Sequence, residues 1–296
     1  MKKTVLTALL AGAAALANAA IPLWPEGVPG AKQIGAERIE DGRIRNVSEP
    51  TLTVYPAAVD RPTKTAVIIC PGGGYEFVSG AREGEQYAYW LSTLGITSFV
   101  LKYRMAEFGH PAPLQDVLRA VRLVRSQATQ FGVDPNRIGI IGSSAGGHLA
   151  ASAGTLFDHP QGRTGNALDA VSARPDFLML LYPVILMDGP AIHAGSRKNL
   201  LGANPAPDLV RLMSVEKQVT AQTPPTILFH SQDDGSVPVE NSIAFYQALT
   251  RAKVPAEMYL YERGGHGMGM RTGQGNATSW PRRAEEWLRE HKLIAQ

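Results

Sequence analysis

Six short, mainly apolar segments constrain the fold of this chain more than any other feature of its sequence. They lie at residues 65–70, 96–103, 137–142, 177–182, 225–230 and 256–261. Segments that are apolar on both faces are typical of parallel strands covered by helices on both sides of a sheet. Stretches with helical patterns lie between them, at residues 84–94, 113–131, 239–253 and 280–291. This alternation predicts an α/β fold with a mainly parallel central sheet flanked by helices.

Two regions depart from this alternation. Residues 51–55 alternate between polar and apolar side chains, which predicts an edge strand. Residues 185–222 have no strand pattern and are rich in Gly, Pro, Asn and Ala, with short helical pieces. Loops of that length in compact domains are usually functional or mobile. We expect this insertion to form a small lid over the strand ends of a single domain spanning residues 20–296.

The first nineteen residues predict a secretory signal peptide. Lys2 and Lys3 are followed by an apolar run at 5–16, and Ala17-Asn18-Ala19 fits the small-x-small pattern of a cleavage site. A transmembrane helix needs roughly 20 apolar residues, and this run is shorter. We therefore expect export to a periplasmic or extracellular location, without stable insertion in a membrane.

Charge and cysteine content exclude several classes of protein. Loss of Lys2 and Lys3 lowers the formal net charge from +3 to +1, and no run of five basic residues occurs, so nucleic acid is not an expected partner. Cys70 is the only cysteine, which excludes an internal disulfide and a four-cysteine zinc site. No H-E-x-x-H motif or carboxylate cluster predicts a metal site, and we expect no cofactor.

The motif Gly142-Ser143-Ser144-Ala145-Gly146 joins a predicted strand to a helix rich in small residues. G-x-S-x-G at such a junction forms a sharp turn that holds the central serine in a strained, exposed conformation. The pattern predicts Ser144 as a nucleophile. The alternative is a glycine-rich turn whose serines are structural.

Three consecutive glycines follow the 65–70 segment, in the sequence PGGGY at 71–75. Their spacing differs from the G-x-G-x-x-G of dinucleotide-binding loops. Bare backbone N–H groups of such a loop can face a carbonyl oxygen that becomes an oxyanion. We assign Gly73 and Gly74 as two donors of an oxyanion hole, with Ala145 as a third. A plain tight turn is the alternative.

Two aspartates, Asp233 and Asp234, follow the 225–230 segment, and His266 lies among glycines after the last segment. A histidine in a glycine loop can bend inward and accept the proton of Ser144, while a carboxylate fixes its tautomer. The chain order Ser, Asp, His is the order found on α/β-hydrolase scaffolds. The residues alone leave both aspartates open.

The chain resembles α/β-hydrolase serine esterases of the BD-FAE group, near the hormone-sensitive-lipase-like branch and often described as acetyl-xylan or feruloyl esterase-like. The resemblance extends over roughly residues 50–290. It rests on the stretches 71–75, 83–91, 94–96, 102–104, 110–116, 142–148, 233–238 and 264–267. It implies a serine carboxylesterase without a cofactor. It also favours Asp234, four residues past the strand-end His230 and three before Val237. One departure is Pro71, where lipase-like relatives have histidine, so a side-chain contact of those relatives is in doubt.

The resemblance also suggests the substrate, which we expect to be a small ester or an acetylated polysaccharide such as xylan. Tyr75, His110 and Ser143 are possible substrate-lining residues. A lipase, a polyester hydrolase or a feruloyl-type esterase is the nearest alternative. A peptidase of the prolyl-oligopeptidase type and an inactive binding module on the same fold are more distant ones.

Overall fold

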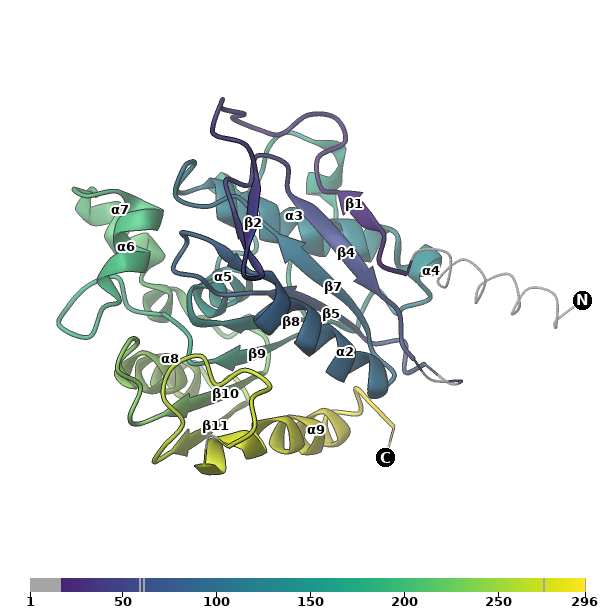
Figure 1. The fold of residues 1–296 in the computed structure, drawn as a ribbon, viewed down its shortest axis with the longest axis vertical. Coiled ribbons are helices and arrows are strands. Elements are labelled where there is room, and N and C mark those ends of the chain that lie inside the picture. Colours follow the sequence, from purple (N-terminus) through teal and green to yellow (C-terminus); the bar gives the residue numbers. More distant parts are fainter. Residues whose placement is uncertain (1–16, 59, 61, 274, 296) are drawn as a thin grey trace, which may run out of the picture.

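The computed structural model describes residues 17–295 except 59, 61 and 274, so most of the predicted signal peptide lies outside the described residues. An eight-stranded sheet runs through the molecule with helices on both faces, and a second sheet of three strands lies at its margin (Figure 1). The prediction of an α/β fold with a mainly parallel central sheet is confirmed.

The central sheet has the strand order β1-β4-β7-β5-β8-β9-β10-β11. These strands are β1 (Ala20–Pro22), β4 (Thr51–Tyr55), β7 (Thr97–Lys102), β5 (Ala66–Cys70), β8 (Ile138–Ser143), β9 (Phe177–Leu181), β10 (Thr226–Ser231) and β11 (Ala256–Tyr261). All neighbours from β7 to β11 are parallel, whereas β4 is antiparallel to both β1 and β7. The prediction that 51–55 is an edge strand is wrong, because the short β1 covers its outer side.

Alternate residues of the inner strands enter two separate apolar cores. In β5, Ile68 belongs to one core and Val67 to the other. The first core is completed by α3 (Ala112–Ser126), α5 (Ser144–Thr155) and α8 (Glu240–Arg251), and the second by α2 (Gln86–Thr93) and α9 (Trp280–Glu290). Strands buried on both faces require apolar residues at almost every position. The edge strand β11 departs from this rule, since Leu260 is 47% exposed.

The remaining elements are short. Residues Gly80–Glu85 form a π-helix that leads into α2, and Gln127 separates α3 from α4 (Ala128–Phe131). The small sheet consists of β2 (Arg38–Glu40), β3 (Arg43–Arg45) and β6 (Val78–Ser79). The segment 185–222 contains α6 (Ala194–Leu201) and α7 (Pro207–Met213), which stand at one side of the molecule (Figure 1). Short 3-10 turns occupy Pro160–Gly162, Ala167–Ala170, Val215–Gln218 and Gly275–Ser279.

The strand order reverses at β5, which fixes where a site can form. The chain passes from β5 to β7 on one side and returns to β8 on the other. Loops that leave the carboxyl ends of two such strands diverge, and α/β proteins bind ligands in the crevice between them. The glycine loop at 71–75 follows β5, and Ser144 follows β8. Both predicted site segments therefore leave the sheet at this switch point.

A buried ion pair joins α3 to the loop after β7. Asp116 and Arg104 are 0% and 1% exposed, with Arg104 Nη2 2.7 Å from Asp116 Oδ1. The carboxylate also accepts hydrogen bonds from the Arg104 N–H at 2.9 Å and from Trp24 Nε1 at 2.8 Å. Burial raises the pKa of Asp116, and the hydrogen bonds and charge of Arg104 oppose that rise.

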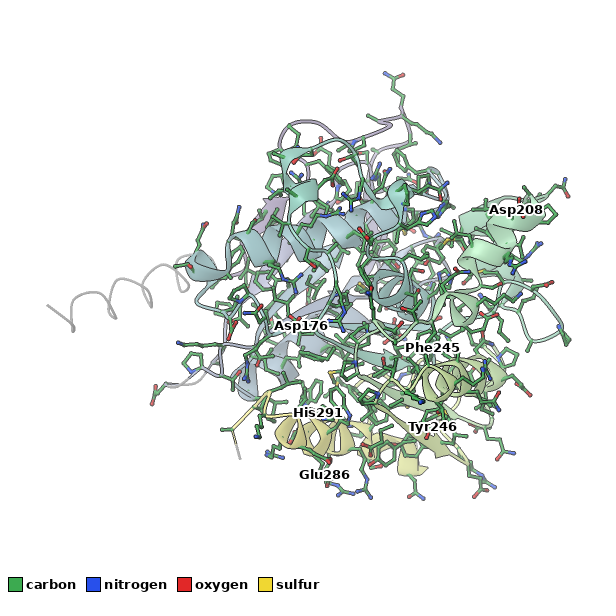
Figure 2. All side chains as sticks on the ribbon, turned by 180° about the vertical axis from the view of Figure 1, so that it is seen from behind. Asp176, Asp208, Phe245, Tyr246, Glu286 and His291 are labelled. Carbon is green, nitrogen blue, oxygen red and sulfur yellow. The ribbon has the colours of Figure 1, made fainter. Side chains whose placement is uncertain are left out.

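Replacement of Asp116 by alanine should lower the free energy of unfolding by about 3–5 kcal/mol, because Arg104 would remain buried without its partner. Urea unfolding measures this loss. Asp208→Ala is the control, since Asp208 is exposed on α7 (Figure 2), and it should change stability by less than about 0.5 kcal/mol. Equal losses of unfolding free energy in the two variants would contradict a stabilising role of the pair of Asp116 with Arg104.

Candidate active site

Ser144, Asp234 and His266 meet at the carboxyl edge of the central sheet. Ser144 begins α5 directly after β8, whereas Asp234 and His266 lie in the loops that follow β10 and β11. His266 Nδ1 is 2.7 Å from Asp234 Oδ2, and His266 Nε2 is 3.0 Å from Ser144 Oγ. In the tautomer that carries its proton on Nδ1, His266 donates a hydrogen bond to the carboxylate, and Nε2 is free to accept one from the serine hydroxyl. A histidine placed in this way can remove the serine proton.

The backbone at Ser144 is strained, with a φ of +54°. Residues other than glycine rarely adopt this backbone conformation, and it persists only where the surrounding structure enforces it. A Cβ at Gly146 would lie 2.0 Å from the Cys70 carbonyl oxygen, and one at Gly142 would lie 2.2 Å from the Gly146 oxygen. Only glycine fits at either position. The turn is thereby held against the end of β5.

Asp234 is surrounded by donors. Its Oδ1 accepts from the N–H groups of Ser236 and Val237, both at 2.9 Å, and its Oδ2 lies 3.3 Å from His230 Nε2. Burial alone would raise the pKa of Asp234, but the hydrogen bonds with His230 and His266 outweigh burial and hold the pKa well below its usual range. The carboxylate therefore stays ionised at neutral pH.

Asp233, the alternative to Asp234, has a different position. Its Oδ1 accepts from the N–H groups of Gly264 and Gly265, at 2.9 and 2.8 Å. Asp233 thus anchors the loop that carries His266, whereas Asp234 contacts the imidazole itself. The two neighbouring carboxylates divide the placement and the orientation of one histidine between them.

The glycine loop presents backbone N–H groups beside Ser144. Gly73 and Gly74 have φ values of +130° and +65°, and a Cβ at Gly73 would lie 2.0 Å from the Phe77 carbonyl oxygen. Within the described part of the chain, the N–H groups of Gly73 and Gly74 donate to no partner. Ala145 is the second residue of α5, and amides of a first helical turn lack acceptors in their own helix. These three donors are available to an oxyanion.

A cleft of about 850 Å³ opens above Ser144. Gly73, Gly74 and His266 line it together with the hairpin tip at 41–43. Phe77 and Met270 are the large apolar side chains on its walls, and most of the others are polar or charged. The cleft therefore suits a polar ligand better than a long acyl chain.

The three possible substrate-lining residues do not lie on the wall of this cleft. The Tyr75 hydroxyl is buried 2.8 Å from His148 Nδ1. His110 Nε2 is 2.8 Å from Gln161 Oε1, and Ser143 Oγ is 2.9 Å from the Tyr87 hydroxyl. Tyr75 follows the glycine loop directly and has a φ of +58°. Its side chain is buried in the core and therefore does not line the cleft.

Glu83, which was not predicted as a site residue, is 8% exposed and lines the cleft. Its Oε2 accepts from the Gly72 N–H at 2.7 Å, and its Oε1 accepts from the Tyr182 hydroxyl at 2.7 Å. The Tyr182 ring makes an edge-to-face contact with the His266 ring, with centroids 5.0 Å apart. One carboxylate thus connects the glycine loop to the support of the histidine. No local pattern distinguishes Glu83 from the exposed Glu85 two residues on.

The insertion also reaches the cleft. His193 lines it, and the Asn199 side chain donates to the Gly74 carbonyl oxygen at 2.9 Å. Segment 185–222 therefore contributes to the wall of the cleft, and its role as a lid stays a prediction.

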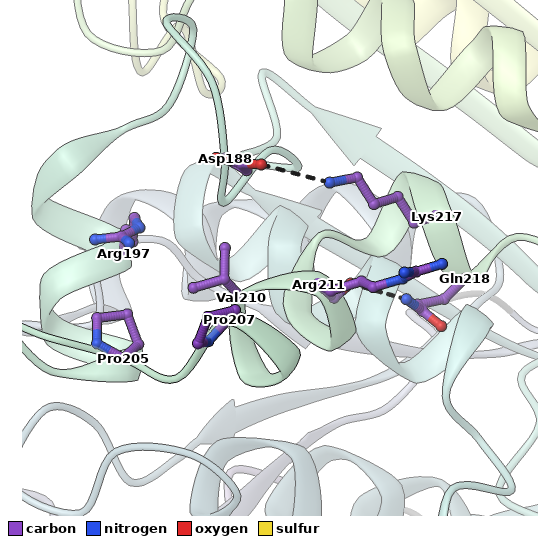
Figure 3. Close-up of a pocket in the computed structure, with 8 residues that line it drawn as sticks. All are labelled: Asp188, Arg197, Pro205, Pro207, Val210, Arg211, Lys217 and Gln218. Atoms are coloured by element: carbon purple, nitrogen blue, oxygen red, sulfur yellow. Dashed lines mark hydrogen bonds and ion pairs between the residues drawn. The ribbon is translucent and has the colours of Figure 1, made fainter.

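A second hollow, of about 650 Å³, lies within the insertion (Figure 3). Lys217 and Asp188 face each other across it at 3.8 Å, beside Val210 and Arg211. It contains none of the predicted site residues. We therefore assign the candidate active site to the cleft above Ser144.

The strand order and the elbow at Ser144 define an α/β-hydrolase, and comparison with solved structures agrees. An acetyl ester-xyloside bifunctional hydrolase from Caldicellulosiruptor lactoaceticus superposes with a TM-score of 0.80 at 38% identity, over 94% of this chain and 98% of that chain. The BD-FAE family model matches residues 52–249, which is more than half of the sequence. The chain belongs to the BD-FAE family of α/β-hydrolase esterases.

Two curated relatives agree with this family. Endo-1,4-beta-xylanase B of Butyrivibrio fibrisolvens is 38% identical over 71% of this chain and 33% of its own length. The acetylxylan esterase of Xylanibacter ruminicola is 35% identical over 72% of this chain and 43% of its own length. The chain thus spans less than half the length of either relative. Of the two names, that of the second relative is an esterase, in agreement with the BD-FAE family match.

No helix within the described residues is both long enough and apolar enough to cross a membrane.

Glu83→Gln should lower kcat by about 10- to 100-fold and change KM less, because an amide cannot accept from both Gly72 and Tyr182 and the donors would shift. Steady-state kinetics on an activated ester measure this split. Glu85→Gln is the matched control, since Glu85 is exposed in the same segment. Equal effects of the two variants, or a change confined to KM, would exclude the positioning role.

The lowered pKa of Asp234 predicts a pH dependence of stability. A depressed pKa means that the ionised carboxylate stabilises the fold above its ordinary value near 3.8, and that this contribution is lost as the pH falls toward the folded pKa. Urea unfolding between pH 3 and pH 7 should show the wild type losing its advantage over Asp234→Asn as the solution is acidified. A constant difference over this range would contradict the prediction.

Proposed function

We propose that this chain is an exported serine carboxylesterase that removes short acyl groups, chiefly acetyl, from carbohydrate such as xylan. The observation that carries the proposal is His266 between Ser144 and Asp234, beside the free N–H groups of the glycine loop. The printed names of two relatives, an acetylxylan esterase and an acetyl ester-xyloside bifunctional hydrolase, support the choice of substrate.

The first half of the reaction transfers the acyl group to the enzyme. Ser144 Oγ attacks the ester carbonyl carbon while its proton passes to His266 Nε2. The electron pair of the carbonyl bond moves to oxygen, where the N–H groups of Gly73, Gly74 and Ala145 hold the negative charge. The bond to the alcohol oxygen then breaks, and that oxygen takes the proton from His266. The product is acyl-Ser144 and a free alcohol.

The second half repeats these roles with water. His266 takes one proton of a water molecule as its oxygen attacks the acyl carbon, and returns that proton to Ser144 Oγ when the bond to the serine breaks. Asp234 stabilises the imidazolium in both halves, which its persistent ionisation permits. The carboxylic acid leaves as its anion at neutral pH.

Two further features support the choice of a carbohydrate ester as substrate and the predicted removal of the signal peptide. The polar walls of the cleft favour a carbohydrate alcohol over the alcohol of a lipid. Strand β1 begins at Ala20 and pairs with β4, so cleavage after Ala19 would keep every residue of that strand and remove only the backbone hydrogen bonds of Asn18 and Ala19 to Val54. This arrangement is compatible with removal of the predicted signal peptide.

Ser144→Ala should lower the turnover of p-nitrophenyl acetate by about 10⁴-fold or more, because the alanine cannot form the acyl-enzyme. Ser152→Ala is the control, since Ser152 is buried on the same helix and its hydroxyl caps only the His148 carbonyl. Circular dichroism checks that both variants fold. Retained turnover in folded Ser144→Ala would refute the mechanism.

The same measurement with longer and different substrates tests the alternatives. Acetate and butyrate esters should react faster than octanoate, because the cleft offers little apolar wall. A maximum at octanoate would favour a lipase, and turnover of a peptide anilide alone would favour a peptidase.

A further inference from the structure

Three arginines line the cleft without a carboxylate partner. Arg43, Arg82 and Arg271 are exposed on its walls, and none of them forms an ion pair within the described part of the chain. The Arg43 guanidinium lies over the Phe77 ring, 4.9 Å from its centroid, and Arg271 Nη2 donates to the Gly267 carbonyl oxygen. We call these three residues the arginine wall. All three line the same cleft as Ser144 and His266.

The acidic residues of the cleft do not neutralise this wall. Glu76 pairs with Arg45, which is not a lining residue, at 2.7 Å. Glu83 has both oxygens engaged by Gly72 and Tyr182. Among the described lining residues, Asp41 is left as the carboxylate without a partner. The formal charges of the lining residues balance, but at the exposed rim of the cleft the three unpaired arginines outnumber the one unpaired carboxylate, Asp41.

The arginine wall begins beside His266, which must protonate the departing alcohol. The departing oxygen takes its proton from His266 Nε2, so it lies within hydrogen-bonding reach of that atom. Arg271 is anchored to Gly267, the residue after His266. The Arg82 carbonyl oxygen lies 4.0 Å from the Cβ position of Gly269, and the Ala81 N–H donates to the Gly42 carbonyl oxygen. The wall thus extends from the histidine loop to the hairpin that carries Arg43.

We infer that the arginine wall binds a carboxylate on the carbohydrate part of the ester. The preferred substrate is then an acetylated oligosaccharide with a uronic acid close to the acetylated sugar. This inference rests on the proposed hydrolysis of esters at Ser144. Guanidinium groups bind carboxylates through paired hydrogen bonds, and several like charges in one cleft also attract an anionic substrate from solution.

The experiment compares two acetylated xylo-oligosaccharides of equal length, one neutral and one with a single glucuronic acid. At low salt, kcat/KM for deacetylation should be about tenfold higher for the acidic substrate, and 0.5 M NaCl should remove most of that preference. Equal values at low salt would overturn the inference. A preference that does not respond to salt would also overturn it, because exposed arginines must be screened.

Variants assign the preference to the wall. Arg271→Gln and Arg82→Gln should each lower the ratio of acidic to neutral kcat/KM toward one. Arg263→Gln is the matched control, because Arg263 is exposed in the histidine loop outside the cleft and should leave the ratio unchanged. An unchanged ratio in the wall variants, or an equal fall in Arg263→Gln, would refute the assignment.

Further measurements distinguish a carboxylate on the acyl group from one on the sugar. They also distinguish failure of the proposed esterase function from failure of the proposed role of the arginine wall. A preference for a p-nitrophenyl ester of succinate over the acetate, with none for the acidic sugar, would place the charge on the acyl side and overturn the inference. Folded Ser144→Ala should still bind the acidic oligosaccharide more tightly than the neutral one in calorimetry. If p-nitrophenyl acetate is not hydrolysed, the proposed function fails and this inference fails with it. Hydrolysis of the acetate without any acidic preference would refute this inference alone.

Discussion

The site depends on a contact between two pieces of backbone that only glycine permits. A Cβ at Gly146 would lie 2.0 Å from the Cys70 carbonyl oxygen and 2.5 Å from that of Pro71, so the start of α5 touches the end of β5 directly. That contact sets the separation of Ser144 from the glycine loop, because each follows one of the two strands. The strained φ of Ser144 persists because the elbow lies at the end of two adjacent, buried parallel strands. A side chain at Gly146 would push the candidate nucleophile away from its candidate oxyanion donors.

Parallel strands were predictable where burial is complete and unpredictable where it is partial. Residues 66–70 and 177–181 are apolar throughout because each face of β5 and β9 meets a helix layer. Strands β2, β3 and β6 have two or three residues each and little buried surface, so no hydrophobic pattern marks them. Partial burial also explains why residues 51–55 were wrongly predicted to form an edge strand. Their alternation reports one exposed face, and it cannot show that β1 adds a further strand alongside.

The candidate site was predictable to the extent that its residues follow strands. Ser144, Asp234 and His266 each stand just after a strand, and parallel strands deliver their ends to one edge. The choice between Asp233 and Asp234 could not be made from local sequence, because both follow β10 and each accepts two backbone N–H groups. Glu83 and the arginine wall come from other elements. Their place beside Ser144 is set by tertiary packing, which leaves no mark on spacing.

The charges of the site are divided between the buried residues beneath it, which we call its floor, and the exposed walls, which we call its rim. Asp234 and Glu83 are buried, and their oxygens accept from imidazole, tyrosine hydroxyl and backbone N–H groups. A buried carboxylate must be hydrogen-bonded, but it does not require a guanidinium when enough neutral donors converge on it. Neither carboxylate forms an ion pair with an arginine of the cleft, and those arginines are exposed. Burying a guanidinium against Glu83 instead would remove a cation from the rim and displace the Gly72 contact. The same set of neutral hydrogen bonds therefore supports the glycine loop and leaves positive charge available where an anionic sugar would enter.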